Sequence, residues 1–166
     1  MDGSLRNLLG ICGLYCGNCP NYLAPRQGDF ATLEALAAEK GVSPADLPCD
    51  GCLSGQVSGG CRECGHGFRD CAQEHGVTWC LECGDFPCQR LEDFRHVHVK
   101  NGISHHATVI EDLRCICKGG ARAWLARKAA EATCPACGRR RYWYDRACSA
   151  CGREAPPFLD ELRPEG

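Results

Sequence analysis

The chain has 166 residues, of which 17 are cysteines, and its formal net charge at pH 7 is −2. Leucine, isoleucine, valine and phenylalanine make up about 18% of it, below the roughly 20% under which a chain struggles to build an apolar core. The small net charge excludes disorder driven by charge repulsion. Metal ions or disulfides must therefore supply part of the folding free energy.

The first residues and the cysteine count decide between metals and disulfides. Residues 1–10, MDGSLRNLLG, have neither the long apolar stretch nor the small-residue cleavage site of a secretory signal. No stretch reaches the ~20 apolar residues of a membrane span. We therefore expect a cytoplasmic protein with reduced thiols and no membrane contact. An odd number of cysteines also cannot pair completely as disulfides, so metal sites are favoured.

The first cysteines, Cys12, Cys16 and Cys19, have the C-x-x-x-C-x-x-C spacing of a radical S-adenosylmethionine cluster. The chain lacks the alternating strands and helices that build the barrel of such an enzyme. Pro20 follows the third cysteine, as a proline does in ferredoxin cluster motifs. Two interpretations stay open: a [4Fe–4S] cluster with a fourth ligand from elsewhere, or a zinc site completed by a distant cysteine.

A cysteine-free segment predicts a helix over residues 30–40. Asp29 is placed to cap its first turn, and Gly41 is placed to end it. Phe30, Leu33 and Ala37 share one face of this helix, which we expect to be the buried face.

A dense cysteine block occupies residues 49–88. Its connecting segments are rich in glycine, serine and aspartate, so loops and short turns are expected there. A helix is expected after Asp85, with Pro87 near its first turn. Cys88 then shares a face with Leu91 and Phe94, which directs its thiol toward the packed side of the helix.

Two further helices are expected before the last cysteines. Residues 104–114 form the first, which ends near Cys115. Residues 119–131 form the second, which is rich in alanine and has Trp124 and Leu125 as its anchors.

The sequence C-x-x-C-G occurs four times, beginning at Cys61, Cys80, Cys134 and Cys148. This is the form of a metal knuckle, in which the glycine permits a positive φ and directs its N–H at a thiolate. The last two copies predict a zinc ribbon, in which two knuckles joined by a β-hairpin bind one Zn²⁺. A rubredoxin-type iron site is the alternative. The four ligands would be Cys134, Cys137, Cys148 and Cys151.

The expected hairpin carries three arginines followed by three aromatic residues, at positions 139–144. Basic residues beside aromatic residues suit stacking on nucleic-acid bases. An ordinary strand whose arginines offset zinc–thiolate charge accounts for them equally well. Residues 118–153 have a net charge of +7, against −6 for residues 1–117, and this asymmetry fits both interpretations.

The cysteine pattern resembles the family catalogued as domain of unknown function 3795. The resemblance covers residues 10 to about 97 and rests on C-G-L-Y-C-G-N-C-P, the two cysteines at 49 and 52, F-R-D-C and C-L-E-C-G-D-F-P-C. Longer relatives also end in a helix that leads to a C-P-x-C-G ribbon. The resemblance implies a cysteine-rich, metal-binding protein and gives no activity.

Eleven cysteines of this region are metal-ligand candidates: Cys12, Cys16, Cys19, Cys49, Cys52, Cys61, Cys64, Cys71, Cys80, Cys83 and Cys88. Eleven do not divide into sets of four, so Cys115 and Cys117, or His66 and His75, are further candidates to complete a site. Cys88 is expected to complete a site with distant cysteines. Its expected partners are Cys12, Cys16 and Cys19, and Cys80 and Cys83 are the competing choice.

The predicted fold is a small, irregular, metal-stabilised α+β protein with short helices and cysteine knuckle loops, followed by a helix and the ribbon hairpin. Residues 1–117 form the cysteine-rich domain, residues 118–153 the helix and ribbon, and residues 154–166 a tail.

The predicted function is that of a structural or adaptor protein that binds two to four zinc ions and acts on another protein. An iron–sulfur redox or enzyme-accessory protein is the alternative, with a [4Fe–4S] cluster at the first three cysteines. Weak nucleic-acid binding through the basic ribbon is a third hypothesis. The chain has no Ser–His–Asp pattern and no phosphate-binding glycine loop, which favours a protein without enzyme activity.

Overall fold

The structure is a computed structural model that describes residues 3–155 and 162–163, so most of the predicted tail lies outside the described residues. The α-helices are α1 (Gly3–Arg6), α2 (Pro20–Gln27), α3 (Phe30–Lys40), α4 (Gly59–Glu63), α5 (Phe68–Glu74), α6 (Gln89–Phe94), α7 (Val109–Gly119) and α8 (Ala121–Ala132). The shorter elements are the 3₁₀ turns η1 (Cys16–Asn18), η2 (Pro44–Asp46) and η3 (Cys80–Glu82) and the strands β1 (Val99–Lys100) and β2 (Ile103–Ser104). This is the small α+β fold that the sequence predicts.

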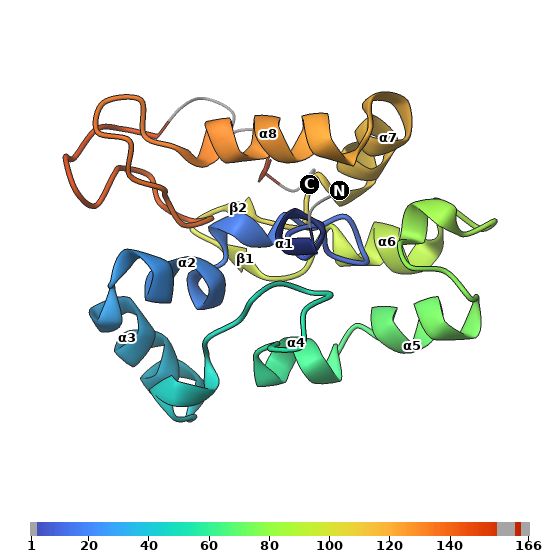
Figure 1. Cartoon of the computed structure of the whole chain (residues 1–166), viewed down its shortest axis with the longest axis horizontal. Helices are drawn as coiled ribbons and strands as arrows, with labels where there is room; N and C mark the ends of the chain where they lie inside the picture. Colours follow the sequence, from blue (N-terminus) through green and yellow to red (C-terminus); the bar gives the residue numbers. More distant parts are fainter. Residues whose placement is uncertain (1–2, 156–161, 164–166) are drawn as a thin grey trace.

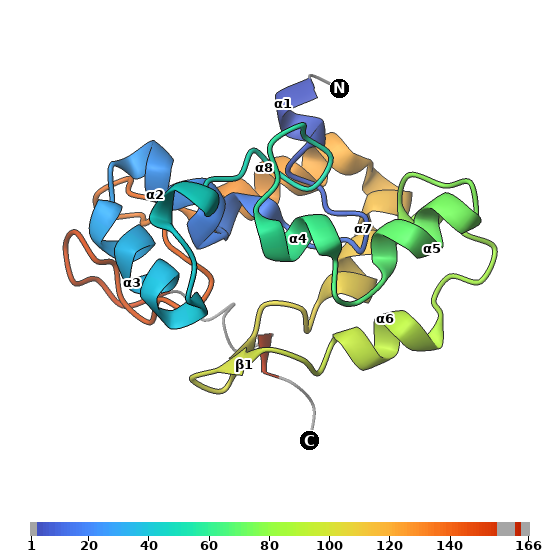
Figure 2. The same cartoon turned by 90° about the horizontal axis from the view of Figure 1, so that it is seen from below.

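Helix α8 runs along one side of the molecule, with α7 at its end (Figure 1). The row from α2 to α5 forms the opposite side, and the segment around α1 lies between the two. Seen from below, α4 lies between the α2–α3 pair and the α5–α6 pair (Figure 2). The expected domain boundary at residue 117 falls inside α7 and stays a prediction.

Among the described residues, three small apolar clusters take the place of one large core. The first joins α5, α6 and α7 to the N-terminal segment around Ile11, and the second packs Trp124 and Leu125 of α8 against Tyr15. The third holds α2 and α3 together. Each cluster of this size buries little apolar surface. Other interactions are therefore needed to hold the helices together.

Helix α3 confirms the prediction for residues 30–40. The carboxylate of Asp29 accepts a hydrogen bond from the backbone N–H of Thr32 (3.1 Å), and Gly41 ends the helix with φ +66°. Leu33 and Ala37 are buried as expected. The expectation for Phe30 is wrong: this first residue of α3 is 65% exposed, and the buried face of the helix begins at Leu33.

The helix expected after Asp85 begins later than predicted. Its first residue is Gln89, and Cys88 stands at the N-cap. The segment before it forms a turn, in which the backbone N–H of Phe86 donates to the carbonyl of Cys83 (3.2 Å), and the Phe86–Pro87 peptide is cis. Leu91 and Phe94 are buried, as the expected face requires.

The helix expected over residues 104–114 is shifted toward the C-terminus, since α7 spans Val109–Gly119. Ser104 belongs instead to a short hairpin with the register Val99↔Ser104 and Lys100↔Ile103. The turn of this hairpin is Asn101-Gly102, and both residues have positive φ values. Asn-Gly is a strong hairpin signal, so the sequence contained this element. The second expected helix is confirmed as α8, with Trp124 and Leu125 buried.

Replacing Gly51 by alanine is expected to destabilise the protein by at least about 2 kcal/mol. Gly51 has φ +105°, and a Cβ atom there would lie 2.1 Å from the carbonyl oxygen of Asn7. That carbonyl accepts the N–H of Cys52 (2.9 Å), so it is not free to move away. Urea unfolding measures the change. Gly55→Ala is the matched control, because a Cβ there meets nothing within 4 Å, and an equal loss in both variants would contradict the argument.

Candidate metal centres

The two C-terminal knuckles have the same local structure. In each, the N–H of the first cysteine donates to a carbonyl five residues later, from Cys134 to Arg139 (2.9 Å) and from Cys148 to Arg153 (2.7 Å). The glycines Gly138 and Gly152 have φ near +73° and +72°, as predicted. Their N–H groups, however, donate to the carbonyl of the first cysteine rather than to a thiolate.

The expected β-hairpin between these knuckles is not present as a strand pair. The described residues contain isolated antiparallel bridges instead, at Thr133↔Arg140 and Ala147↔Glu154. Each bridge closes one knuckle on itself. The connector between the knuckles, residues 139–147, is therefore left free to form turns that contact the rest of the protein.

The four C-terminal cysteines form one compact group: Cys134, Cys137, Cys148 and Cys151. All four sulfur atoms lie within 4.8 Å of one another. The Sγ–Sγ distance is 3.7 Å from Cys134 to Cys151 and 3.5 Å from Cys137 to Cys148. The first cysteine of each knuckle is buried and the second is exposed. This group could hold a metal ion.

The protonation equilibria of these thiols favour a bound cation. The backbone N–H of Ala136 lowers the pKa of Cys134 to about 6, and the N–H of Ala150 lowers that of Cys148. The N–H of Arg139 lowers the pKa of Cys137, but hydrogen bonds with the neighbouring sulfurs raise it to about 12. The thiols therefore share protons, and a cation that replaces these protons relieves the repulsion between thiolates.

The connector between the knuckles is anchored on the N-terminal part of the chain. Tyr142 donates its hydroxyl hydrogen bond to Asp29 (2.7 Å), and the indole N–H of Trp143 donates to the carbonyl of Tyr15 (3.3 Å). The guanidinium of Arg140 donates to the hydroxyl of Tyr15, and that of Arg141, a buried residue, donates to a carbonyl of α8.

A second group of cysteines lines a cavity between α5, η3 and α6. All four are half-buried: Cys71, Cys80, Cys83 and Cys88. Burial raises the pKa of Cys80 to about 12, and the charges of the other three thiols add to this effect. The structure therefore places Cys88 beside Cys80 and Cys83, the competing set of the sequence analysis. At the rim, His75 Nδ1 lies 3.7 Å from the sulfur of Cys83.

A third group lies under the N-terminal segment and comprises Cys12, Cys16, Cys52 and Cys64. Burial raises the pKa values of Cys12 and Cys16 well above the ordinary value, and the charge of Cys52 adds to both. The guanidinium of Arg69 lies 3.8 Å from the sulfur of Cys52. Burial also raises the pKa of Cys52, because it penalises the charged form of a thiol.

The remaining three candidates of this region are Cys19, Cys49 and Cys61. Burial and then the charge of Cys61 raise the pKa of Cys19 to about 12. Charge interactions also join Cys19 to Cys16, and Cys61 to both Cys52 and Cys64. These three cysteines are therefore neighbours of the third group.

The other candidates from the sequence lie apart from these groups. Cys115 and Cys117 are exposed on α7, and among the described residues neither belongs to a compact set of potential ligands. His75, Cys83 and Asp85 form such a set, with all ligand atoms within 4.8 Å. His66 instead faces another histidine, with 3.1 Å between its Nε2 and that of His98.

Four histidines gather where the connector meets the β1–β2 hairpin: His66, His98, His105 and His106. His105 stacks on Trp143 with ring centroids 3.9 Å apart and contacts the hydroxyl of Tyr144. His106 is buried and stacks on Phe94 at 3.8 Å. The cluster therefore links the C-terminal connector to the hairpin and to α6.

The cluster predicts that acid destabilises the protein. Burial, and then the charges of His98 and His66, lower the pKa of His106 to about 3. Between about pH 6.5 and 3 the unfolded state therefore binds a proton that folded His106 does not, and stability falls as the pH falls by about 1.4 kcal/mol per unit.

This loss is measured by urea unfolding at pH 7 and pH 5. His106→Leu should lose less stability than the native chain over this range. The acid-sensitive thiolates are common to both proteins, so their effect cancels in the difference. The exposed His96 supplies the control variant His96→Leu, and equal losses in all three proteins would refute the assignment.

Comparisons with known proteins bear on the N-terminal region. A family model described as "Protein of unknown function (DUF3795)" matches residues 8–93. No curated protein and no solved structure matches the chain. In the part of the chain that the structure describes, no helix has the length and apolar character needed to cross a membrane.

Proposed function

The chain belongs to the DUF3795 family, and because that family names no activity, we propose a function from the sulfur chemistry of this chain. The protein is a multi-site metal–thiolate protein with structural zinc at the C-terminal centre and further metal at the N-terminal cysteines. Its role is structural, as an adaptor for another protein.

The spacing of the four C-terminal sulfurs is the observation that carries this proposal. Four ligands at about 2.3 Å from one zinc ion lie about 3.8 Å apart at the edges of a tetrahedron. The distances of 3.7 Å and 3.5 Å match those edges. Four thiolates leave no coordination position for water or substrate, which is the arrangement of a structural site rather than a catalytic one.

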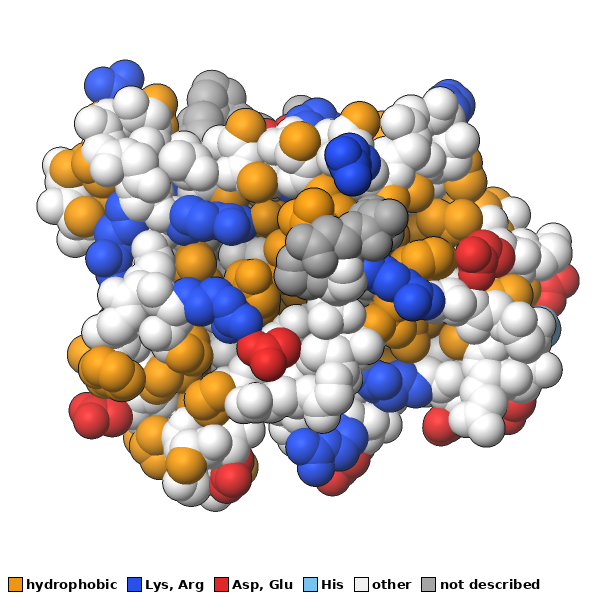
Figure 3. Space-filling model, in the orientation of Figure 1, with side chains coloured by type: hydrophobic (Ala, Val, Ile, Leu, Met, Phe, Trp, Pro, Cys, Tyr) orange, Lys and Arg blue, Asp and Glu red, His pale blue; other side chains and the backbone are white. Residues whose placement is uncertain are grey.

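The internal contacts of the arginines argue for a protein partner rather than nucleic acid. Arg140 and Arg141 donate to groups within the protein, and the guanidinium of Arg139 lies 3.8 Å from the carboxylate of Asp29. Lysine and arginine side chains are spread over the face in Figure 3 rather than gathered at the knuckles. Nucleic acid would therefore meet little free basic surface there, and only weak, salt-dependent binding is expected.

Iron–sulfur chemistry is the second candidate, and the wider spacing of the N-terminal cysteines favours it. None of the third group belongs to a set whose ligand atoms all lie within 4.8 Å, among the described residues. A [4Fe–4S] cluster attaches each thiolate to a different iron atom, so its ligands lie further apart than those of one ion.

Anaerobic purification followed by metal analysis tests the proposal. The native chain should contain one zinc ion at the C-terminal centre. Cys137→Ser should release this ion, while the chain retains its other metals. Iron in place of zinc at this centre would reject structural zinc and support the rubredoxin-type alternative. No metal at this centre would reject the proposal as a whole.

A further inference from the structure

The cavity between α5, η3 and α6 has a lining suited to an inorganic cluster. Its four cysteines come from three separate elements: Cys71 from α5, Cys80 and Cys83 from η3 and its end, and Cys88 from the start of α6. The remaining wall is mainly apolar, with Phe68, Ala72, Val77, Phe86 and Leu91. Four convergent thiols in an apolar wall are a ligand set without another evident purpose.

The cavity has room for an inorganic group. Its volume is about 20 Å³, which is enough to admit a water-sized sphere among the residues that line it.

The sulfur spacing distinguishes this group from the C-terminal centre. At the C-terminal centre all four sulfurs lie within 4.8 Å of one another. The four cysteines of the cavity do not form such a set among the described residues, although their charges interact. This wider spacing points to a polynuclear centre, whose ligands bind separate metal atoms.

We propose that Cys71, Cys80, Cys83 and Cys88 bind a [4Fe–4S] cluster. Each thiolate would bind one iron atom, and the apolar residues would exclude water from the cluster. This goes beyond the structural zinc of the proposed function, since it assigns a different cofactor to different residues. It also differs from a cluster at Cys12, Cys16 and Cys19.

A mononuclear site at the rim is the competing arrangement. His75, Cys83 and Asp85 lie close enough to share one ion, and the sulfur of Cys83 could turn toward either set. His75 and Asp85 are exposed, however, although His75 also lines the cavity, whereas Cys71, Cys80 and Cys88 are half-buried around it. The two arrangements therefore share only Cys83 and predict opposite effects of mutation.

The test is anaerobic reconstitution of the full chain with ferrous iron and sulfide. The native chain should gain an absorption band near ~400 nm and, after reduction with dithionite, the electron paramagnetic resonance signal of a [4Fe–4S]⁺ cluster. Cys71→Ala and Cys88→Ala should each lower bound iron and sulfide by about four atoms per chain. His75→Ala, Asp85→Asn and Cys117→Ser should retain them.

Three outcomes would overturn the proposal. The first is a native chain that takes up no iron and sulfide. The second is iron that is unaffected in Cys71→Ala and Cys88→Ala, which would place any cluster elsewhere. The third is loss of one zinc ion in His75→Ala, which would support the rim site.

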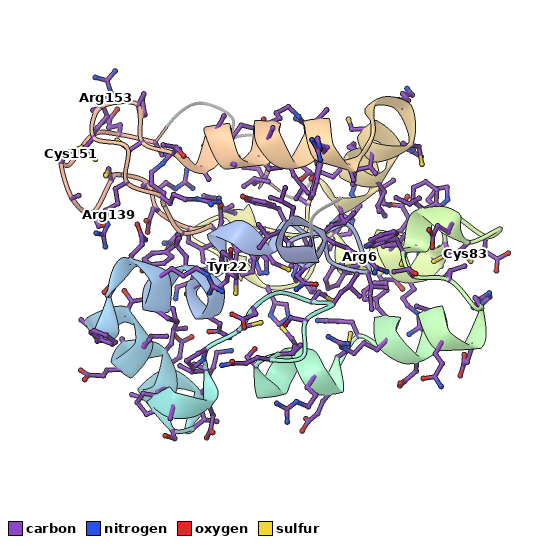
Figure 4. All side chains as sticks on the ribbon, viewed as in Figure 1. Arg6, Tyr22, Cys83, Arg139, Cys151 and Arg153 are labelled. Atoms are coloured by element: carbon purple, nitrogen blue, oxygen red, sulfur yellow. The ribbon has the colours of Figure 1, made fainter. Side chains whose placement is uncertain are left out.

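The zinc of the C-terminal centre provides an independent reference for folding. Cys83 and Cys151 lie at opposite ends of the molecule along its longest axis (Figure 4), so a variant at one centre leaves the ligands of the other intact. A variant that lacks the cluster but retains the zinc ion is folded and counts as evidence about the cluster. Absence of zinc in a native chain that binds the cluster would reject the proposed function alone.

Discussion

A Cys148→Ser protein is expected to lose one metal ion per chain and several kcal/mol of folding stability. Cys148 is buried, and its sulfur lies 3.5 Å from that of Cys137. The binding free energy of a structural zinc site is folding free energy, about 10–16 kcal/mol in zinc-finger peptides, so three remaining ligands retain only part of it. The connector anchored at Tyr142 should loosen with the knuckles.

Metal analysis by mass spectrometry and thermal unfolding of the anaerobically purified chain measure both effects. Cys117→Ser is the matched control, because Cys117 is exposed on α7 and lies outside the compact ligand sets of the described residues. Its metal content and unfolding midpoint should equal those of the native chain. Full metal content in Cys148→Ser would show that Cys148 is only a buried thiol.

An Asp112→Ala protein is expected to lose about 3–5 kcal/mol of folding stability. The buried carboxylate of Asp112 accepts hydrogen bonds from the indole of Trp124 and the hydroxyl of Thr108, both at 2.8 Å. It also lies 2.8 Å from the ammonium group of Lys128, whose side chain is largely buried. Alanine would leave a buried cation without its counter-ion and an indole N–H without its acceptor, where the first turn of α7 packs against α8.

Urea unfolding of Asp112→Ala, Asp112→Asn and Lys128→Met measures these contributions. Asp112→Asn retains an acceptor for Trp124 and should cost less than alanine. Adding Lys128→Met to Asp112→Asn should recover part of the loss, because the unpaired charge is then gone. The exposed Asp46 supplies the control variant Asp46→Ala, and a loss there as large as in Asp112→Ala would contradict the explanation.

Local capping signals in the sequence were sufficient to predict where α3 begins and ends. Asp29 and Gly41 define both ends of α3, because a side-chain acceptor and a left-handed residue act within one turn. The same signals could not place Phe30 or the start of α6. The first depends on which helix packs nearby, and the second depends on a turn that the cysteine spacing does not encode.

Of the candidate metal centres, too, only some ligand sets could be predicted from the sequence. The four C-terminal ligands could be predicted because each knuckle is local and only one short connector joins the two. The partners of Cys88 could not, since Cys71 approaches it only when α5 packs beside α6 in the first apolar cluster.

The carboxylate of Asp29 joins the first turn of α3 to the C-terminal connector. One oxygen of this group, Oδ2, accepts hydrogen bonds from both Thr32 in α3 and Tyr142 in the connector. Native-state hydrogen exchange reports the opening of local units. We therefore expect the first turn of α3 and the C-terminal connector to open together, although 113 residues separate Asp29 from Tyr142.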